Sequence, residues 1–175
     1  YRYAAAPDAS RKATLLFSGS AQGAALTAAA ALKERYDVGV EMWSATSYKA
    51  LREDALAVER WNRLHPSQPA RVPLVTQLLG GSPGPIVAVT DFMKIVPEQE
   101  ARWLPGRNFT PLGTDGMGRS DTREALRRFF EIDEGHVVVA VLYALAGHGL
   151  VDHDLVTKAI ADYDIDPDAV DPYLV

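Results

Sequence analysis

The stretch Ala13-Thr-Leu-Leu-Phe-Ser18 is a short apolar run closed by Gly19, which is typical of a buried strand. The next segment, Gly23-Ala-Ala-Leu-Thr-Ala-Ala-Ala-Ala-Leu32, consists largely of strong helix formers. A second strand is predicted at Val38-Gly-Val-Glu-Met-Trp43. Strand, helix and strand in this order predict parallel strands joined by a right-handed crossover.

The same alternation continues along the chain. Hydroxyls at residues 44–47 can cap a helix that begins near Tyr48. Residues 86–89 are apolar on both faces, as a central parallel strand should be, and residues 109–112 are predicted as a fourth strand. We therefore expect an α/β fold, a three-layer α/β/α sandwich with a mostly parallel sheet, in one domain over residues 1–175. The central or near-central strands should contain Leu15, Val40 and Val87.

Further helices follow from their capping residues and apolar faces. Asp121 and Glu124 have the spacing of a capping box for a helix over residues 122–130, which should pack through Leu126 and Phe129. Residues 137–146 are also predicted as a helix, capped by Asp133. Shorter helices are expected at residues 74–79, 97–103 and 155–163, and residues 164–175 should form an extended tail over the surface.

Composition excludes several classes of function. The chain has 175 residues, 47% of them hydrophobic, and a formal charge of −5, which argues against nucleic acid as a partner. No apolar run approaches the roughly 18 residues that span a bilayer, so no membrane partner is expected. Cysteine is absent, which permits the reducing cytoplasm that we expect as its location. The first residue is Tyr1, and we expect a piece of a longer polypeptide.

The loop of residues 113–121 contains three glycines between a predicted strand and a predicted helix. Backbone N–H groups in such a loop can bind an anion, and Arg119 and Ser120 could add donors. The alternative is a structural turn in which Asp115, Ser120 and Asp121 satisfy their own backbone next to Gly116. The loop matches neither of the common glycine-rich phosphate-binding motifs.

Asp91 and Lys94 form a second candidate pair at the end of the strand 86–89. The carboxyl edge of an open α/β sheet is where ligands usually bind, although a helix cap plus a surface charge would have the same pattern. The four histidines do not have metal-ligand spacing, so no metal site is predicted.

Four separated strings resemble one family. They are Met42-Trp-Ser-Ala-Thr-Ser-Tyr48, Val58-Glu-Arg-Trp-Asn-Arg-Leu-His-Pro66, Thr90-Asp-Phe-Met-Lys94 with Val96-Pro-Glu-Gln99, and Leu112-Gly-Thr-Asp-Gly-Met-Gly-Arg-Ser-Asp-Thr-Arg-Glu-Ala-Leu-Arg-Arg-Phe-Phe-Glu131. In this order they resemble the C-terminal domain of the homodimeric-type pyruvate dehydrogenase decarboxylase component, a transketolase-like enzyme. Met117 and Glu53-Asp-Ala55 depart from the family pattern.

This resemblance implies a thiamine diphosphate enzyme that decarboxylates pyruvate and passes the acetyl group to a lipoyl domain. The chain would be its third domain, and its partners would be the other domains, the second subunit of a homodimer and the dihydrolipoamide acetyltransferase component. The family holds Mg²⁺ and the diphosphate with a Gly-Asp-Gly motif followed by asparagine. Here Thr114 precedes Asp115-Gly116, and no asparagine follows Asn108.

We therefore assign no catalytic, cofactor-binding or metal-binding residue to this domain, and we expect thiamine diphosphate and magnesium elsewhere in the parent enzyme. The domain should support dimerisation and docking within the complex. The alternative is a stand-alone module that binds a small molecule or an anion through residues 113–121.

Overall fold

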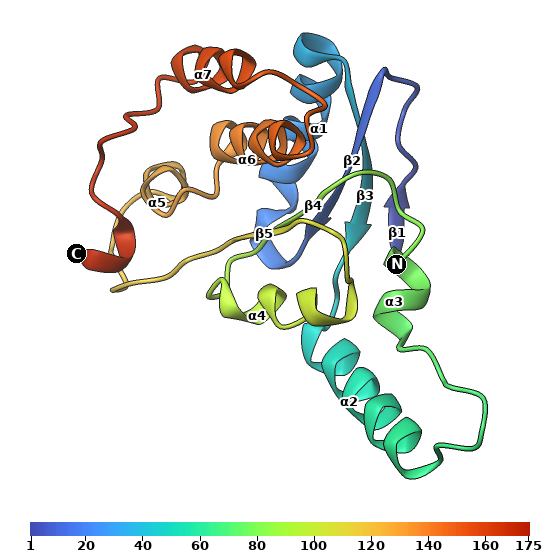
Figure 1. Cartoon of the computed structure of the whole chain (residues 1–175). Helices are drawn as coiled ribbons and strands as arrows, with labels where there is room; N and C mark the ends of the chain where they lie inside the picture. Colours follow the sequence, from blue (N-terminus) through green and yellow to red (C-terminus); the bar gives the residue numbers. More distant parts are fainter.

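The computed structural model describes all residues, 1–175. Its strands form one five-stranded sheet in the order β1-β3-β2-β4-β5 (Figure 1). The strands β2 to β5 are parallel, and β1 joins the edge of β3 antiparallel. Their bounds are Arg2–Ala4 for β1, Arg11–Phe17 for β2, Val38–Ser44 for β3, Ile86–Val89 for β4 and Phe109–Leu112 for β5. The predicted, mostly parallel sheet is confirmed.

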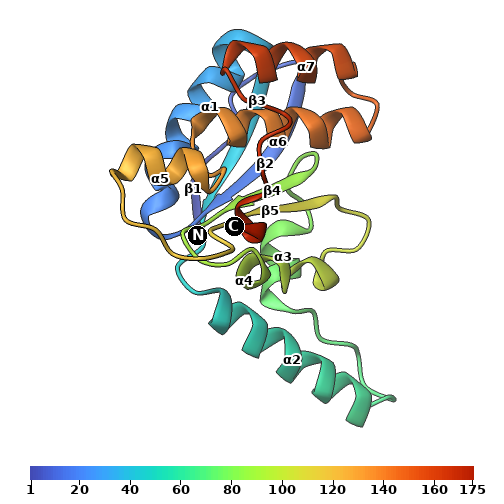
Figure 2. The same ribbon diagram turned by 90° about the vertical axis from the view of Figure 1, so that its left-hand side faces the viewer.

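Helices cover both faces of this sheet (Figures 1 and 2). One face carries α1 (Gln22–Tyr36), α5 (Arg123–Phe129), α6 (Glu134–Gly147) and α7 (His153–Asp162). The other carries α2 (Tyr48–Leu64), α3 (Leu74–Leu79) and α4 (Ile95–Glu98). Three short 3₁₀ helices occupy Gly19–Ala21, Ala101–Trp103 and Pro172–Leu174. None of the helices is both long enough and apolar enough to cross a bilayer.

The two faces follow from the two-residue period of the strands. Leu15 on β2 and Val87 on β4 are fully buried under α1 and α6. Their neighbours Leu16 and Ala88 are buried on the opposite face, against α2 and α3. The central strands therefore read as continuous apolar runs, because both of their faces are covered.

Small side chains bring α1 and α6 close to the sheet. Ala25 and Ala28 of α1 are fully buried, and Ala140 and Ala144 of α6 are buried as well. The helix α6 begins where Asp133 caps it, with a carboxylate oxygen accepting from the backbone N–H of His136 at 3.0 Å. The helix predicted at residues 137–146 is confirmed.

Some predicted boundaries are wrong. The helix expected at residues 97–103 is divided into α4, which begins at Ile95, and a 3₁₀ turn at Ala101–Trp103. Pro97 fits inside α4 because it lies in the first turn, where its missing N–H has no helical partner to lose. The edge strand β1 was not predicted from the sequence. The tail is irregular until its last 3₁₀ turn, where Pro172 is buried.

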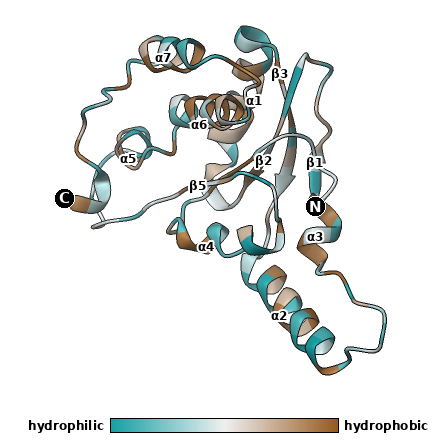
Figure 3. Ribbon diagram, viewed as in Figure 1, coloured by the Kyte–Doolittle hydropathy of each residue, from teal (hydrophilic) through white to brown (hydrophobic).

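Figure 3 shows that α2 carries both hydrophilic and hydrophobic segments along its length. Only Tyr48 and Ala55 of this helix are buried. Its carboxyl-terminal half projects away from the sheet (Figure 1).

Candidate functional site

A hollow of about 520 Å³ lies at the edge of the sheet where β2, β4 and β5 end. Three segments meet there: the turn after β2, the residues that follow β4 and the loop after β5. The carboxyl edge is the usual place for ligands in open α/β sheets. Polar lining residues come from all three segments and from α5: Ser20, Asp91, Thr114, Arg119, Asp121, Arg123 and Arg127.

Asp91 holds the turn after β2 in place. One carboxylate oxygen accepts from the backbone N–H of Ser20 at 2.9 Å, and the other is buried with no hydrogen-bond partner. This carboxylate packs against Gly19, which has a φ of +56° and where a Cβ would collide with it. Asp91 and Lys94 therefore do not pair, because Asp91 is already engaged with this turn.

The loops after β4 and β5 are joined to each other. The N–H of Thr114 donates to the carbonyl of Phe92 at 2.8 Å, and its hydroxyl donates to the carbonyl of Asp91 at 3.0 Å. The carboxylate of Asp115 accepts from the backbone N–H of Lys94 at 3.3 Å and lies 4.0 Å from its Nζ. The structure thus brings both candidate groups together, and Asp115, rather than Asp91, is the partner of Lys94.

The C-terminal tail packs on the same loop. Gly116 has a φ of +99°, and a Cβ at this position would collide with the carbonyl oxygen of Pro172. Gly116 is thus required by a close backbone approach that fixes the loop against the tail. The side chain of Ser120 is exposed.

Three arginines border the hollow without a carboxylate partner. The guanidinium of Arg119 lies 4.0 Å from the centre of the Phe129 ring, which is a cation–π geometry. Arg127 donates to the carbonyl of Ser20 at 2.7 Å, and Arg123 is exposed. None of the three is within ion-pair distance of a carboxylate. Sequence reasoning found Arg119 and missed the others, although positions 119, 123 and 127 recur every four residues.

The predicted cap of α5 is displaced by one residue. Thr122 is the N-cap, and its hydroxyl accepts from the N–H of Ala125 at 3.3 Å. Asp121 instead accepts from the adjacent N–H of Thr122 at 2.7 Å. Of the two residues expected to pack from this helix, Leu126 and Phe129 are both only partly buried, whereas Phe130 just after it is 9% exposed.

Two polar side chains, Glu100 and Tyr48, are buried inside the molecule, apart from the hollow. Glu100 is fully buried, and neither of its carboxylate oxygens has a hydrogen-bond partner; the hydroxyl of Tyr48 is also buried without one. Burial raises the pKa of Glu100 to about 7, and the charge of Arg52 opposes that shift. Burial also raises the pKa of Tyr48, with a smaller contribution from Glu100. Nothing in the local sequence around Glu100 indicates this burial.

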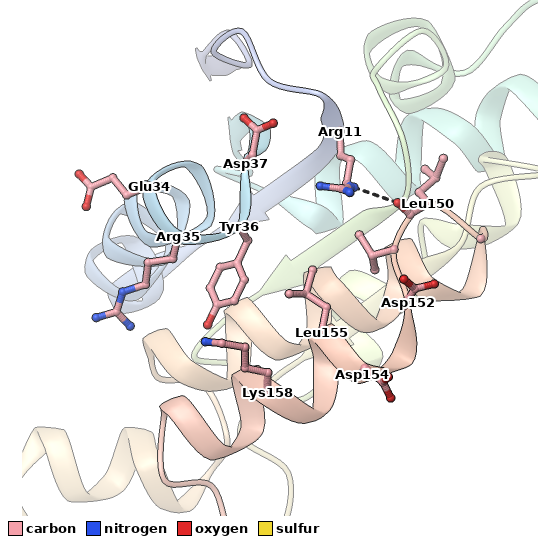
Figure 4. A pocket seen from close by; sticks show the side chains of 12 residues that line it. Arg11, Glu34, Arg35, Tyr36, Asp37, Leu150, Asp152, Asp154, Leu155 and Lys158 are labelled. Carbon is pink, nitrogen blue, oxygen red and sulfur yellow. Dashed lines mark hydrogen bonds between the residues drawn. The ribbon is translucent and has the colours of Figure 1, made fainter.

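A larger hollow, about 710 Å³, lies at the opposite edge of the sheet (Figure 4). Its cations already have partners within the chain. Arg11 donates to the carbonyl of Leu150 at 2.9 Å, Lys158 pairs with Asp162 at 2.5 Å, and Arg35 lies over the ring of Tyr163. No group of three His, Asp or Glu side chains converges as metal ligands would, here or elsewhere.

The model of the transketolase-like TK C-terminal domain family matches residues 1–133. The chain belongs to this family. Pyruvate dehydrogenase E1 components of Pseudomonas aeruginosa and Mycobacterium tuberculosis are 46% and 47% identical to it, over 94% and 98% of this chain. These matches cover 19% and 18% of the relatives, so the chain spans about a fifth of their length. The resemblance noted in the sequence is confirmed.

A split gene transketolase, described as an inactive beta4 tetramer, superposes on this member of the family with a TM-score of 0.48 and 20% identity. The superposition covers 79% of this chain and 40% of the transketolase chain. This likeness is too distant to bear on function.

One of the strings that carried the resemblance to the family builds the projecting end of α2. The ring of Trp61 stacks on His65 at 4.5 Å, and the guanidinium of Arg71 lies 3.8 Å from its centre. The amide of Asn62 exchanges two hydrogen bonds with the backbone of Arg71, at 2.9 and 2.8 Å. The string therefore folds the following loop back onto the helix.

The residues of this domain do not fit a diphosphate and magnesium site. Asp115 is the acidic residue that most nearly matches the family motif, and its carboxylate is engaged with the backbone and side chain of Lys94. Mg²⁺ takes oxygen ligands in near-octahedral geometry, and no group of three acidic or histidine side chains converges around Asp115.

Proposed function

We propose that the chain is the non-catalytic third domain of a thiamine diphosphate-dependent pyruvate dehydrogenase E1 component. That enzyme decarboxylates pyruvate and passes the acetyl group to a lipoyl domain. The observation that carries this proposal is the 46–47% identity to pyruvate dehydrogenase E1 components across nearly the whole chain, which corresponds to only about a fifth of their length. The engagement of Asp115 with Lys94 supports placing the cofactor outside this domain.

Binding of the cofactor tests the first part of this proposal. Calorimetric titration of the chain with thiamine diphosphate and Mg²⁺ should give no saturable heat beyond that of inorganic pyrophosphate with Mg²⁺, whereas the complete enzyme should bind the cofactor itself. A micromolar site on the chain alone that pyrophosphate does not compete for would contradict the proposal, because it would need about 8 kcal/mol of binding free energy that these residues do not supply.

The role of the domain is to support dimerisation and docking in the complex. Three apolar side chains beside the hollow support this role: Phe92, Met93 and Ile95 are 55%, 54% and 53% exposed. Adjacent exposed apolar side chains of this size are typical of protein–protein contact surfaces. Other domains of the same enzyme and its second subunit are the occupants that we propose for this surface, with the dihydrolipoamide acetyltransferase component as a further partner.

Assembly of the complete enzyme tests this role. Phe92→Asp with Met93→Asp should lower the dimer fraction in sedimentation equilibrium, while leaving the melting temperature of the 175-residue chain nearly unchanged. Leu64→Asp is the matched control, since Leu64 is 54% exposed at the far end of α2. Equal dimer fractions in both variants would contradict the assignment of this surface.

The coding sequence upstream of Tyr1 separates this proposal from the stand-alone module. An in-frame Gly-Asp-Gly motif followed by asparagine is expected for the third domain of one polypeptide. A stand-alone domain or a subunit of a split enzyme would lack it.

A further inference from the structure

Three guanidinium groups surround the hollow at the carboxyl edge of the sheet. Arg119 lies in the loop before α5, and Arg123 and Arg127 are one helical turn apart on α5; all three line the hollow. Three other arginines of the chain, Arg2, Arg102 and Arg128, have carboxylate partners. The arginines of the hollow have none.

The local contacts of these arginines leave donors free. A guanidinium has five N–H donors, and stacking over a ring uses none of them. Arg119 is held over Phe129 in this way, and Arg127 directs one nitrogen to the carbonyl of Ser20. Arg123 makes no side-chain hydrogen bond. Two of the three groups are thus positioned by the fold while most of their donors remain available.

Two carboxylates also line the hollow, and both are engaged with the backbone. Asp91 accepts from the N–H of Ser20, and its second oxygen is buried against Gly19. Asp121 accepts from the N–H of Thr122. Three cations and two carboxylates leave an excess of one positive charge, and the free donors belong to the arginines.

We propose that this hollow binds a small anion with at least two negative charges, of the phosphate-ester class. Guanidinium groups match the oxygens of a phosphate with paired, charge-assisted hydrogen bonds. The volume of about 520 Å³ is within the range of small-molecule sites. The hydroxyl of Thr114 is committed to Asp91, so the arginines supply the recognition. This binding site goes beyond the role in assembly and does not depend on it.

Titration of the full 175-residue chain with inorganic pyrophosphate at constant ionic strength tests the proposal. Calorimetry should give saturable binding with one site per chain. Arg123→Gln and Arg127→Gln should each weaken it by about tenfold, the scale of one charge-assisted contact. Arg60→Gln is the matched control, because Arg60 is exposed on α2 and also has no ion pair. Circular dichroism and thermal melts establish that each variant is folded.

Several results would overturn the proposal. Absence of saturable heat would mean that the hollow binds no such anion, and an equal loss in the Arg60 variant would mean that the arginines of the hollow are not the site of binding. Binding of a hexa-glutamate peptide, with no binding of pyrophosphate, would mean that the arginines meet an acidic protein segment instead. Loss of dimerisation in the Phe92 and Met93 variant concerns only the role in assembly, because neither residue lines this hollow.

Discussion

On one face of the sheet, α1, α6 and α7 bury their side chains in a single cluster of 27 apolar residues. On the other face, α2, α3 and the turn after α4 share a cluster of nine, and the unpaired polar groups of Glu100 and Tyr48 are buried on the same side. The same strands thus stabilise one wholly apolar layer and one layer with a buried carboxyl group. The first layer should therefore determine the stability of the chain, and the second the dependence of that stability on pH.

The largest effect should come from the core of the first layer. Leu142 is fully buried in α6, and Leu142→Ala should lower the free energy of unfolding by about 4 kcal/mol through lost burial and a residual cavity. Leu79→Ala in the second layer should cost about 2 kcal/mol. The helix α3 is only six residues long and Leu74 and Leu78 beside Leu79 are exposed, so α3 can shift to fill part of the cavity. Urea denaturation measures both, and a larger loss for Leu79→Ala would reverse the comparison.

The second prediction uses the buried carboxyl group. The pKa of Glu100 is raised from 4.5 to about 7 in the folded chain, so the folded state holds a proton that the unfolded state releases between these values. The contribution of Glu100 to the free energy of unfolding is therefore most favourable below pH 4.5. It is lost as the pH rises toward 7, by about 3 kcal/mol at most.

Denaturation at pH 5 and pH 7.5 tests this dependence on Glu100. Glu100→Gln should remove most of the loss, whereas Glu98→Gln, at an exposed position of α4, should leave it in place. If stability fell equally between pH 5 and pH 7.5 in the unchanged chain and in both variants, a group other than Glu100 would cause the dependence on pH.

The third prediction concerns the end of α5, at the rim of the first layer. Phe130 is 9% exposed and Phe129 is only partly buried, so Phe130→Ala should cost about 3 kcal/mol and Phe129→Ala about 1 kcal/mol. Thermal unfolding gives the order. The opposite order would place Phe129 in the core, as the pattern of the sequence predicted.

The elements that the sequence predicts correctly are those with a local signal. The alanine-rich helix α1, the buried strand β4 and the Asp133 cap of α6 follow from composition, periodicity and capping. The strand β1 has three residues, and its structure depends on pairing with β3 across about 40 residues of chain, which no local pattern reveals.

The candidate site was only partly predictable for the same reason. The ends of β4 and β5 place Asp91 and the loop of residues 113–121 around one hollow. The partner of Lys94 is not Asp91, three residues away, but Asp115 on the next loop. The burial of Glu100 could not be predicted, because it arises from packing by elements that are distant in sequence. The excess of arginines around the hollow could not be predicted either, because it depends on which carboxylates the fold brings near them.

The smallest effect should come from the cap of α5, the helix of the first layer that has no fully buried residue in its seven. Its start therefore depends on hydrogen bonds to its first N–H groups more than on the core. Thr122→Ala removes the hydroxyl that accepts from Ala125 and should cost about 1 kcal/mol. Asp121→Ala removes a bond to the adjacent N–H outside the helix and should cost about half as much. Chemical denaturation with both variants measures the difference, and a larger loss for Asp121→Ala would restore the cap predicted from the sequence. In that case the loop that borders the hollow would end at Asp121, not at Thr122, and it would be less firmly joined to α5.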